Sequence, residues 1–310
     1  MHEHIAPAVY YFEVHLLCAS IACLAAYVLT SVWRGAASVK YWIWVATSLN
    51  FLIPLGGFFN RFGASRIPWA TQLAGLDEVG VGISRNLTIG AVLLTIWLCG
   101  VAFMLARLLV RLRRARRDDG ATRSPVPLER RLPAHGFPVM LSAAGQGPSV
   151  DGVLRPRISL PSGIDRLLSE RELDAVLIHE VTHARRRDNL VGLLHEIALC
   201  GLWFHPLVWL TGSRLALFRE LSCDDSVIES SRGADLITAL AKLTDPGYSR
   251  LLRPGAATLF RHRLARLGSR HPRTARGAAD LALLAIYAAV LLICVIETVA
   301  HTPGCFRVVG

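Results

Sequence analysis

Four stretches of this sequence are long enough and apolar enough to cross a lipid bilayer. A transmembrane helix needs about 20 predominantly apolar residues. Such stretches run at 16–33, 41–59, 87–106 and 281–300, and each is nearly free of charge. Hydrophobic residues make up 53% of the chain, more than a soluble domain usually carries, so the excess must face lipid. The sequence therefore predicts a multi-pass α-helical membrane protein embedded in a lipid bilayer.

The positions of lysine and arginine predict how these spans are oriented, because cytoplasmic flanks are enriched in both. Arg34 is the first such residue and follows the first span. Six arginines crowd residues 107–117 after the third span, and further arginines precede the fourth. We therefore expect both termini outside, the loop 60–86 outside, and residues 107–280 in the cytoplasm.

The same pattern divides the chain into regions. We expect an N-terminal membrane region at 1–106, a cytoplasmic domain at 107–280, the fourth span, and a short outer tail at 301–310. The basic, proline-containing stretch 107–138 reads as a linker that leaves the membrane. The cytoplasmic segment is large enough to have its own core.

A metal-binding pattern lies within this cytoplasmic segment, in the run His179-Glu180-Val181-Thr182-His183. Ser169 and Glu172 form a capping box that predicts a helix start upstream. Two histidines four residues apart lie on one helix face and supply two of the three protein ligands of a hydrolytic zinc site. Glu180 then fits the general base. The alternative is a polar helix with two satisfied histidines and a solvated glutamate.

The third ligand should come from a second helix, on which Glu220 is the candidate and Asp224 lies one turn later. Metal-bound histidines usually donate their second ring proton to a carboxylate, and Asp224 or Asp188 could accept it. The alternative is that these acids are surface charges or ion-pair partners of Arg214 or Arg219.

A predicted strand, Arg157-Ile158-Ser159-Leu160, lies shortly before the motif helix. In related zinc peptidases an edge strand at this place pairs with the extended substrate, so these four residues are candidates for the same role. The alternative is an internal strand of a hairpin.

The segment 189–204 is apolar almost all round. If it crossed the membrane, the histidines and Glu220 would lie on opposite sides, so we expect it to stay buried in the protein or to rest at the membrane interface. Arg214, Arg219, His195 and His205 are unranked candidates for stabilising a reaction intermediate.

The sequence contains four runs typical of one family: GVLRPRISLP (152–161), HEVTHARRRD (179–188), HPLVW (205–209) and ELSCD (220–224). Together they resemble the BlaR/MecR membrane metallopeptidases, which form metallopeptidase family 56. In that family the two histidines and the glutamate of an E-x-x-C-D element bind zinc, and the glutamate between the histidines is catalytic. The resemblance thus implies Zn2+ held by His179, His183 and Glu220, catalysis by Glu180, a zincin-like (gluzincin) α+β domain, and a bacterial inner membrane.

The resemblance also implies a function: a signal-transducing protease that cleaves a cytoplasmic transcriptional repressor, itself, or both, in response to an external signal such as an antibiotic. Antibiotic-responsive relatives carry a penicillin-binding sensor domain after the last span. We expect none here, because the sequence ends about ten residues beyond Ala300. The stimulus would then enter through the 60–86 loop, through the spans, or through a separate sensor partner. The alternatives are a Ste24/HtpX-like quality-control metalloprotease and a non-enzymatic membrane scaffold.

The net charge of +11 raises the question of a nucleic-acid partner. The arginines bracket the predicted spans, and no nucleic-acid-binding motif accompanies them. Membrane topology and anionic lipid account for the charge, so we expect no direct nucleic-acid binding.

Overall fold

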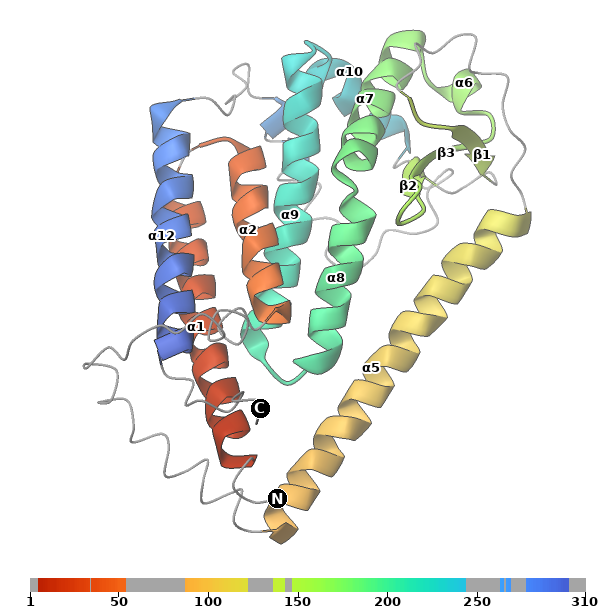
Figure 1. Ribbon diagram of the computed structural model, residues 1–310. Coiled ribbons are helices and arrows are strands. Elements are labelled where there is room, and N and C mark those ends of the chain that lie inside the picture. The colour runs from red at the N-terminus through yellow and green to blue at the C-terminus, as the bar shows by residue number, and fades with distance from the viewer. Residues whose placement is uncertain are drawn as a thin grey trace.

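The computed structural model describes residues 5–33, 35–53, 87–121, 136–142, 147–243, 263–264, 266–268 and 277–300, without side chains at 5–11, 87–88, 114–121 and 297–300. These residues are mostly helical, with one small sheet (Figure 1). The predicted outer loop at 60–86, residues 122–135 of the predicted linker and the predicted tail at 301–310 lie outside the described residues.

Three of the described helices are long and apolar enough to cross a membrane: α1 (Ile5–Val32), α5 (Leu87–Ala121) and α12 (Ala278–Ala300). Their apolar windows overlap the first, third and fourth predicted spans. Helix α5 continues to Ala121, so the first part of the predicted linker at 107–138 is helical, and its role as a linker stays a prediction. Residues 107–117 are rich in leucine, arginine and alanine, which are strong helix formers, and the first proline comes only at Pro125.

Helix α2 (Ala37–Leu52) covers part of the predicted second span at 41–59, and residues 54–59 lie outside the described residues. Protein surrounds much of this helix: Tyr41, Ile43 and Trp44 are almost completely buried. That α2 crosses the membrane stays a prediction.

Helices α8 (Asp188–Gly201) and α9 (Pro206–Glu229) form an antiparallel hairpin beside α2 and α5 (Figure 1). Pro206 occupies the first position of α9, where a missing backbone N–H costs little. The inner side chains of the hairpin share one apolar core with α1, α2 and α12, and include Leu199, Val208 and Leu215. The chain therefore returns along α9 toward the end from which α8 started, which keeps the two motifs together as predicted.

A smaller α+β unit lies at one end of the helices and contains α6 (Ile164–Leu167), α7 (Glu170–Arg186) and α10 (Gly233–Leu243). Its sheet has the order β1-β3-β2, formed by β1 (Val139–Ser142), β2 (Ser149–Asp151) and β3 (Arg157–Pro161). A second apolar core joins this sheet to α7 and α10, and Val227 of α9 belongs to it. Helix α9 thus contributes to both cores.

The turn between β2 and β3 depends on Gly152. Its φ is 82°, in the left-handed region that favours glycine, and a Cβ there would lie 2.4 Å from the carbonyl oxygen of Arg155. This turn sets the antiparallel register in which Val150 lies opposite Ile158.

The edge-strand hypothesis for Arg157–Leu160 is wrong. β3 is the central strand, because it pairs with β1 in parallel and with β2 antiparallel. Both of its edges already carry hydrogen bonds, so no substrate strand can add to them. The internal-strand alternative is the one that the structure contains.

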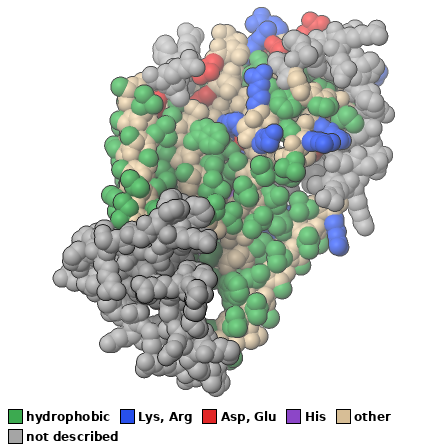
Figure 2. All heavy atoms as spheres, viewed as in Figure 1, with side chains coloured by type: hydrophobic (Ala, Val, Ile, Leu, Met, Phe, Trp, Pro, Cys, Tyr) green, Lys and Arg blue, Asp and Glu red, His purple; other side chains and the backbone are tan. Residues whose placement is uncertain are grey.

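The basic flanks predicted to be cytoplasmic lie at the same end of the molecule as α7. The Trp33 indole N–H donates to Asp280 Oδ1 at 3.3 Å, and the Ala37 backbone N–H donates to Asp225 Oδ2 at 3.2 Å. These bonds join the α1–α2 turn to the start of α12 and to the last turns of α9. Figure 2 shows hydrophobic side chains over the helical part and most lysine and arginine side chains toward this end. Which side of a membrane this end faces stays a prediction.

Candidate active site

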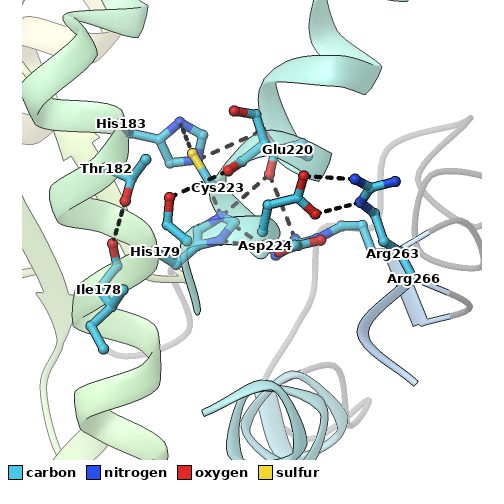
Figure 3. A network of polar contacts seen from close by, with 12 residues as sticks. Ile178, His179, Thr182, His183, Glu220, Cys223, Asp224, Arg263 and Arg266 are labelled. Carbon is cyan, nitrogen blue, oxygen red and sulfur yellow. Dashed lines mark hydrogen bonds and ion pairs between the residues drawn. The ribbon is translucent and has the colours of Figure 1, made fainter. Parts of the chain in front are cut away.

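Helix α7 presents the two histidines of the HEVTH motif from one face. Its predicted capping box is confirmed: Ser169 Oγ accepts from the Glu172 backbone N–H at 3.4 Å, and Glu172 Oε2 accepts from the Ser169 backbone N–H at 2.7 Å. Helical spacing then brings His179 and His183 together, with their Nε2 atoms 3.1 Å apart (Figure 3).

Glu220 approaches both histidines from α9. Its Oε2 lies 3.6 Å from His179 Nε2, and its Oε1 lies 3.8 Å from His183 Nε2. Burial opposes ionisation of Glu220, but its contacts with the two histidines and the nearby Arg219 outweigh burial and hold the pKa of this carboxyl well below its ordinary value. Two imidazole nitrogens and an anionic oxygen therefore face one small space.

This donor set fits a zinc ion, which hydrolytic sites hold with three nitrogen or oxygen ligands and one open position. The local field also favours a cation. Burial lowers the pKa of His179, yet Asp224 and Glu220 outweigh burial and raise that pKa to about 9. Carboxylates that favour a proton on the imidazole also favour a metal ion beside it.

Cys223 is a second potential third ligand. Among the described residues, ligand atoms of His179, His183 and Cys223 lie within 4.8 Å of one another. The Cys223 Sγ, however, lies 3.4 Å from His183 Nδ1 rather than Nε2, and it accepts a hydrogen bond from Arg186 at 3.0 Å. Burial raises the pKa of Cys223 well above its ordinary value, which keeps the thiol neutral and a poor ligand. Glu220 suits the Nε2 pair better.

Asp188 supports His183 from the side opposite Glu220. His183 Nδ1 donates to Asp188 Oδ2 at 2.6 Å, which keeps the ring proton on Nδ1 and the lone pair on Nε2. Asp188 also accepts from Arg186 at 2.6 Å and from the Tyr41 hydroxyl of α2 at 2.6 Å. Burial opposes ionisation of Asp188, but these bonds outweigh it and lower the pKa of Asp188.

Asp224 occupies the corresponding place beside His179. Its Oδ1 lies 3.2 Å from His179 Nδ1, although the contact falls short of hydrogen-bond geometry. Arg263 donates to both oxygens of Asp224, at 3.0 and 2.8 Å, and its guanidinium lies 3.6 Å from Glu220 Oε2 (Figure 3). Each motif histidine thus has one of the two predicted supporting carboxylates next to its Nδ1 atom.

A cleft of about 400 Å³ opens beside the two histidines, and Glu180 is part of its wall. Ser149 and Val150 of β2 line one side of the cleft, and apolar residues of α10 also line it. Asn189 at the start of α8 donates to the Val150 carbonyl at 2.8 Å, which ties β2 to the helix that follows the motif. The candidate base, the histidines and a sheet edge therefore share one concave surface.

Of the four residues considered for stabilising a reaction intermediate, only Arg219 lies at the cleft. Arg219 lines the cleft and donates to Glu220 Oε1 at 3.1 Å. His195 contacts Ser48 and His205 contacts Ser20 in the helical core, and Arg214 stacks over the Tyr27 ring. The last three therefore lie away from the cleft.

Two residues at the site were missed by the sequence reasoning, which assigned no role to Tyr41 or Arg263. Tyr41 sits at the start of an apolar span, and Arg263 is one of many arginines in a basic segment. Neither belongs to a short motif, so only the tertiary fold could reveal them.

Comparison with known proteins agrees with this geometry. The family model for the BlaR1 peptidase M56 matches residues 12–235. The chain is 35% identical over 85 residues to the regulatory protein BlaR1 of Bacillus licheniformis, which is 27% of this chain and 14% of that protein. It is 23% identical over 82 residues to the methicillin resistance mecR1 protein of Staphylococcus aureus, which is 26% of this chain and 14% of that protein.

The similarity to these individual relatives thus covers only a small part of their length. The family model, in contrast, extends from α1 into the start of α10 and includes every motif of the candidate site. The matched region contains the two motif histidines, Glu220 of α9 and most of the apolar helical core. A match of this extent shows that the chain belongs to the BlaR1 peptidase M56 family.

Proposed function

We propose that this protein is a membrane-bound zinc metalloendopeptidase. The observation that carries the proposal is the meeting of the two α7 Nε2 atoms, 3.1 Å apart, with the Glu220 carboxylate at the wall of a cleft. In this proposal His179, His183 and Glu220 hold Zn2+, and Asp188 and Asp224 orient the two imidazoles. Membership in a peptidase family supports the enzymatic reading over a scaffold.

The proposed reaction is hydrolysis of a peptide bond. When bound, zinc would supply a Lewis acid that acidifies water and polarises the scissile carbonyl. Glu180 takes the proton that the attacking water loses, holds it on its carboxylate, and passes it to the leaving amine. The geometry suits this role, because Glu180 lines the cleft directly beside His179.

Two cations are placed to balance the charge that develops on the scissile carbonyl oxygen. Arg219 and Arg263 both line the cleft. Arg263 is held by two bonds to Asp224, which gives its guanidinium a fixed orientation. A fixed cation stabilises developing negative charge without reorganising during the reaction.

The substrate-binding edge is proposed to be β2 in place of β3. β1 and β2 are the two edge strands in the sheet order, and of these β2 contributes Ser149 and Val150 to the wall of the cleft. An extended peptide that displaces the Asn189 side chain from the Val150 carbonyl would add a strand along this edge by main-chain hydrogen bonds and bring its scissile bond to the site.

The physiological role proposed is signal transduction across a bacterial inner membrane in an antibiotic response. It is supported by the names of the similar proteins, a regulatory protein and a methicillin resistance protein. In this proposal residues 107–280 are cytoplasmic and form a zincin-like (gluzincin) domain, and both termini are outside. The substrate is a cytoplasmic transcriptional repressor, the chain itself, or both.

The decisive test is Glu180→Gln in the full chain, reconstituted in lipid vesicles. We expect zinc content to stay at the wild-type level, while self-cleavage and cleavage of a co-expressed repressor fall by about 10²–10⁴-fold, because general-base catalysis is lost. Glu170→Gln is the matched control, since Glu170 is exposed on the first turn of the same helix. Cleavage by Glu180→Gln at the rate of the Glu170→Gln control would refute the mechanism.

A further inference from the structure

The hairpin of α8 and α9 contains a long uncharged stretch. Between Glu196 and Arg214, residues 197–213 include no aspartate, glutamate, lysine or arginine. The chain reverses direction halfway along this stretch, after Gly201 and before Pro206. The limb on α8 therefore has five uncharged residues (197–201) and the limb on α9 has eight (206–213), which correspond to about 7.5 and 12 Å at 1.5 Å per residue. Both limbs are too short to cross a hydrocarbon core of about 30 Å, but the longer is enough to approach the middle.

Contacts with α5 show how deep the hairpin lies relative to a candidate membrane-spanning helix. Near the basic end of α5, Arg107 and Arg111 pair with Glu196 of α8 at 3.5 and 2.8 Å. Farther along α5, the Trp97 indole N–H donates to the Gly201 carbonyl at 2.9 Å. Trp97 lies ten residues from Arg107, or about 15 Å along the helix. The tip of the hairpin is thus level with the middle of the apolar window Ile89–Arg113.

Several backbone groups of the turn have hydrogen-bond partners within the protein. Irregular backbone at membrane depth is tolerated only where its polar groups find partners within the protein. The Trp97 indole serves Gly201, and the Trp209 indole donates to the Trp203 carbonyl at 2.8 Å. The backbone N–H of His205 donates to the Leu202 carbonyl at 2.9 Å. The carbonyls of Gly201, Leu202 and Trp203 thus all have donors within the protein, as an apolar environment favours.

The two faces of the hairpin differ in what covers them. The inner face packs on α1 and α2, where His195 contacts Ser48 and Thr211 contacts Cys23. On the outer face the large apolar side chains of Ile197, Phe204 and Trp209 are 43–46% exposed. Figure 2 shows hydrophobic side chains across this helical part of the molecule, with few charges among them. An apolar face continuous with a candidate spanning helix fits lipid acyl chains.

We propose that α8 and α9 form a re-entrant hairpin, which enters the bilayer from the side of the active site, turns near the bilayer centre at Phe204 and leaves on the same side. Its outer face contacts acyl chains. This arrangement explains how an almost fully apolar helix can separate the two metal-binding motifs and still return Glu220 to His179. The proposal does not depend on proteolysis, because it rests on depth and burial alone.

The test measures the depth of Phe204 in the full chain. An environment-sensitive fluorescent amino acid replaces Phe204 in protein reconstituted into phosphatidylcholine vesicles that contain brominated lipid. We expect bromine near the middle of the acyl chain to quench the emission about twofold more than bromine near the headgroup, because the tip lies near mid-depth. The same probe at Leu98 of α5 is the lipid-exposed control, and at Leu154, beyond β2, the water-exposed control.

Three outcomes separate the alternatives. Quenching at position 204 like that at Leu98, with none at Leu154, supports the hairpin. Quenching at 204 by headgroup-proximal bromine alone would show an interfacial helix and overturn the proposal, as would an absence of quenching at 204 while Leu98 responds. A probe at Trp203, the neighbouring residue in the turn, repeats the test if the variant at 204 does not fold; there quenching by mid-chain bromine supports the hairpin, and quenching by headgroup-proximal bromine alone, or none, overturns it. Zinc content, measured in parallel, reports separately on the proposed enzyme.

Discussion

The contact between Tyr41 and Asp188 leads to a prediction about metal affinity. The Tyr41 hydroxyl donates to Asp188 Oδ1 at 2.6 Å, and both groups are buried. Asp188 in turn holds His183 at 2.6 Å. In Tyr41→Phe, Oδ1 loses the only hydrogen bond that the described residues give it, while the ring under the Arg186 guanidinium remains, 4.3 Å away. The substitution therefore removes one bond and little packing.

The size of the effect follows from the type of bond. A hydrogen bond to a charged group contributes about 1.5–3 kcal/mol, and removing a group that supports a metal ligand typically weakens metal binding by about 10–100-fold. We expect Tyr41→Phe to weaken zinc binding within this range, because an unsupported Asp188 orients His183 less firmly. Titration with a competing chelator measures the affinity, and the absorption spectrum of the cobalt-substituted protein reports the ligand geometry.

Tyr287→Phe is the matched control for this experiment. The Tyr287 hydroxyl is also buried and bonds Thr47 at 2.5 Å, but it lies in the helical core without contact to the site. If the loss of a buried hydroxyl acted only through the stability of the fold, zinc affinity would fall equally in both variants. Zinc affinity within about twofold of wild type in Tyr41→Phe, or an equal loss in Tyr287→Phe, would refute the reasoning.

Three further predictions concern the ligands, the nearby cation and the orientation. Glu220→Ala should lose most of its zinc whereas Cys223→Ala should keep it, and metal analysis giving the reverse would make the thiol the third ligand. Arg263→Ala should lower the cleavage rate by about 10²-fold or more with zinc retained, and Arg263→Lys should restore part of it; a rate unchanged in both would remove this charge from the mechanism. A reporter active only in the cytoplasm should work when fused after Arg117 and fail after Ser65, and the opposite result would invert the topology.

The sequence was sufficient for the features that depend on local order. A capping box at Ser169 and a four-residue histidine spacing specify a helix and its functional face, because both act within one or two turns. Uncharged stretches of membrane-crossing length likewise identify α1, α5 and α12. These properties do not depend on which distant segments meet.

Features that depend on contacts between residues far apart in the sequence could not be predicted. The order β1-β3-β2 could not be predicted, because β2 has only three residues and shows no clear alternation, and this error moved the proposed substrate edge by one strand. Arg263 meets His179 across 84 residues, and Tyr41 meets Asp188 across 147. No pattern within the chain connects partners at such separations.

Helix α9 is the element that links the membrane core to the site. Its first half packs in the core of α1, α2 and α12, its middle presents Glu220, and Val227 near its end belongs to the core of the α+β unit. Helix α2 packs against it and also reaches the site through Tyr41. Because packed helices shift as rigid bodies, a displacement of α2 along α9 would change the support of His183 and the position of Glu220 together. The residues that follow α2 are those predicted to lie outside, so a signal received there would reach the proposed metal ligands along the length of this one helix.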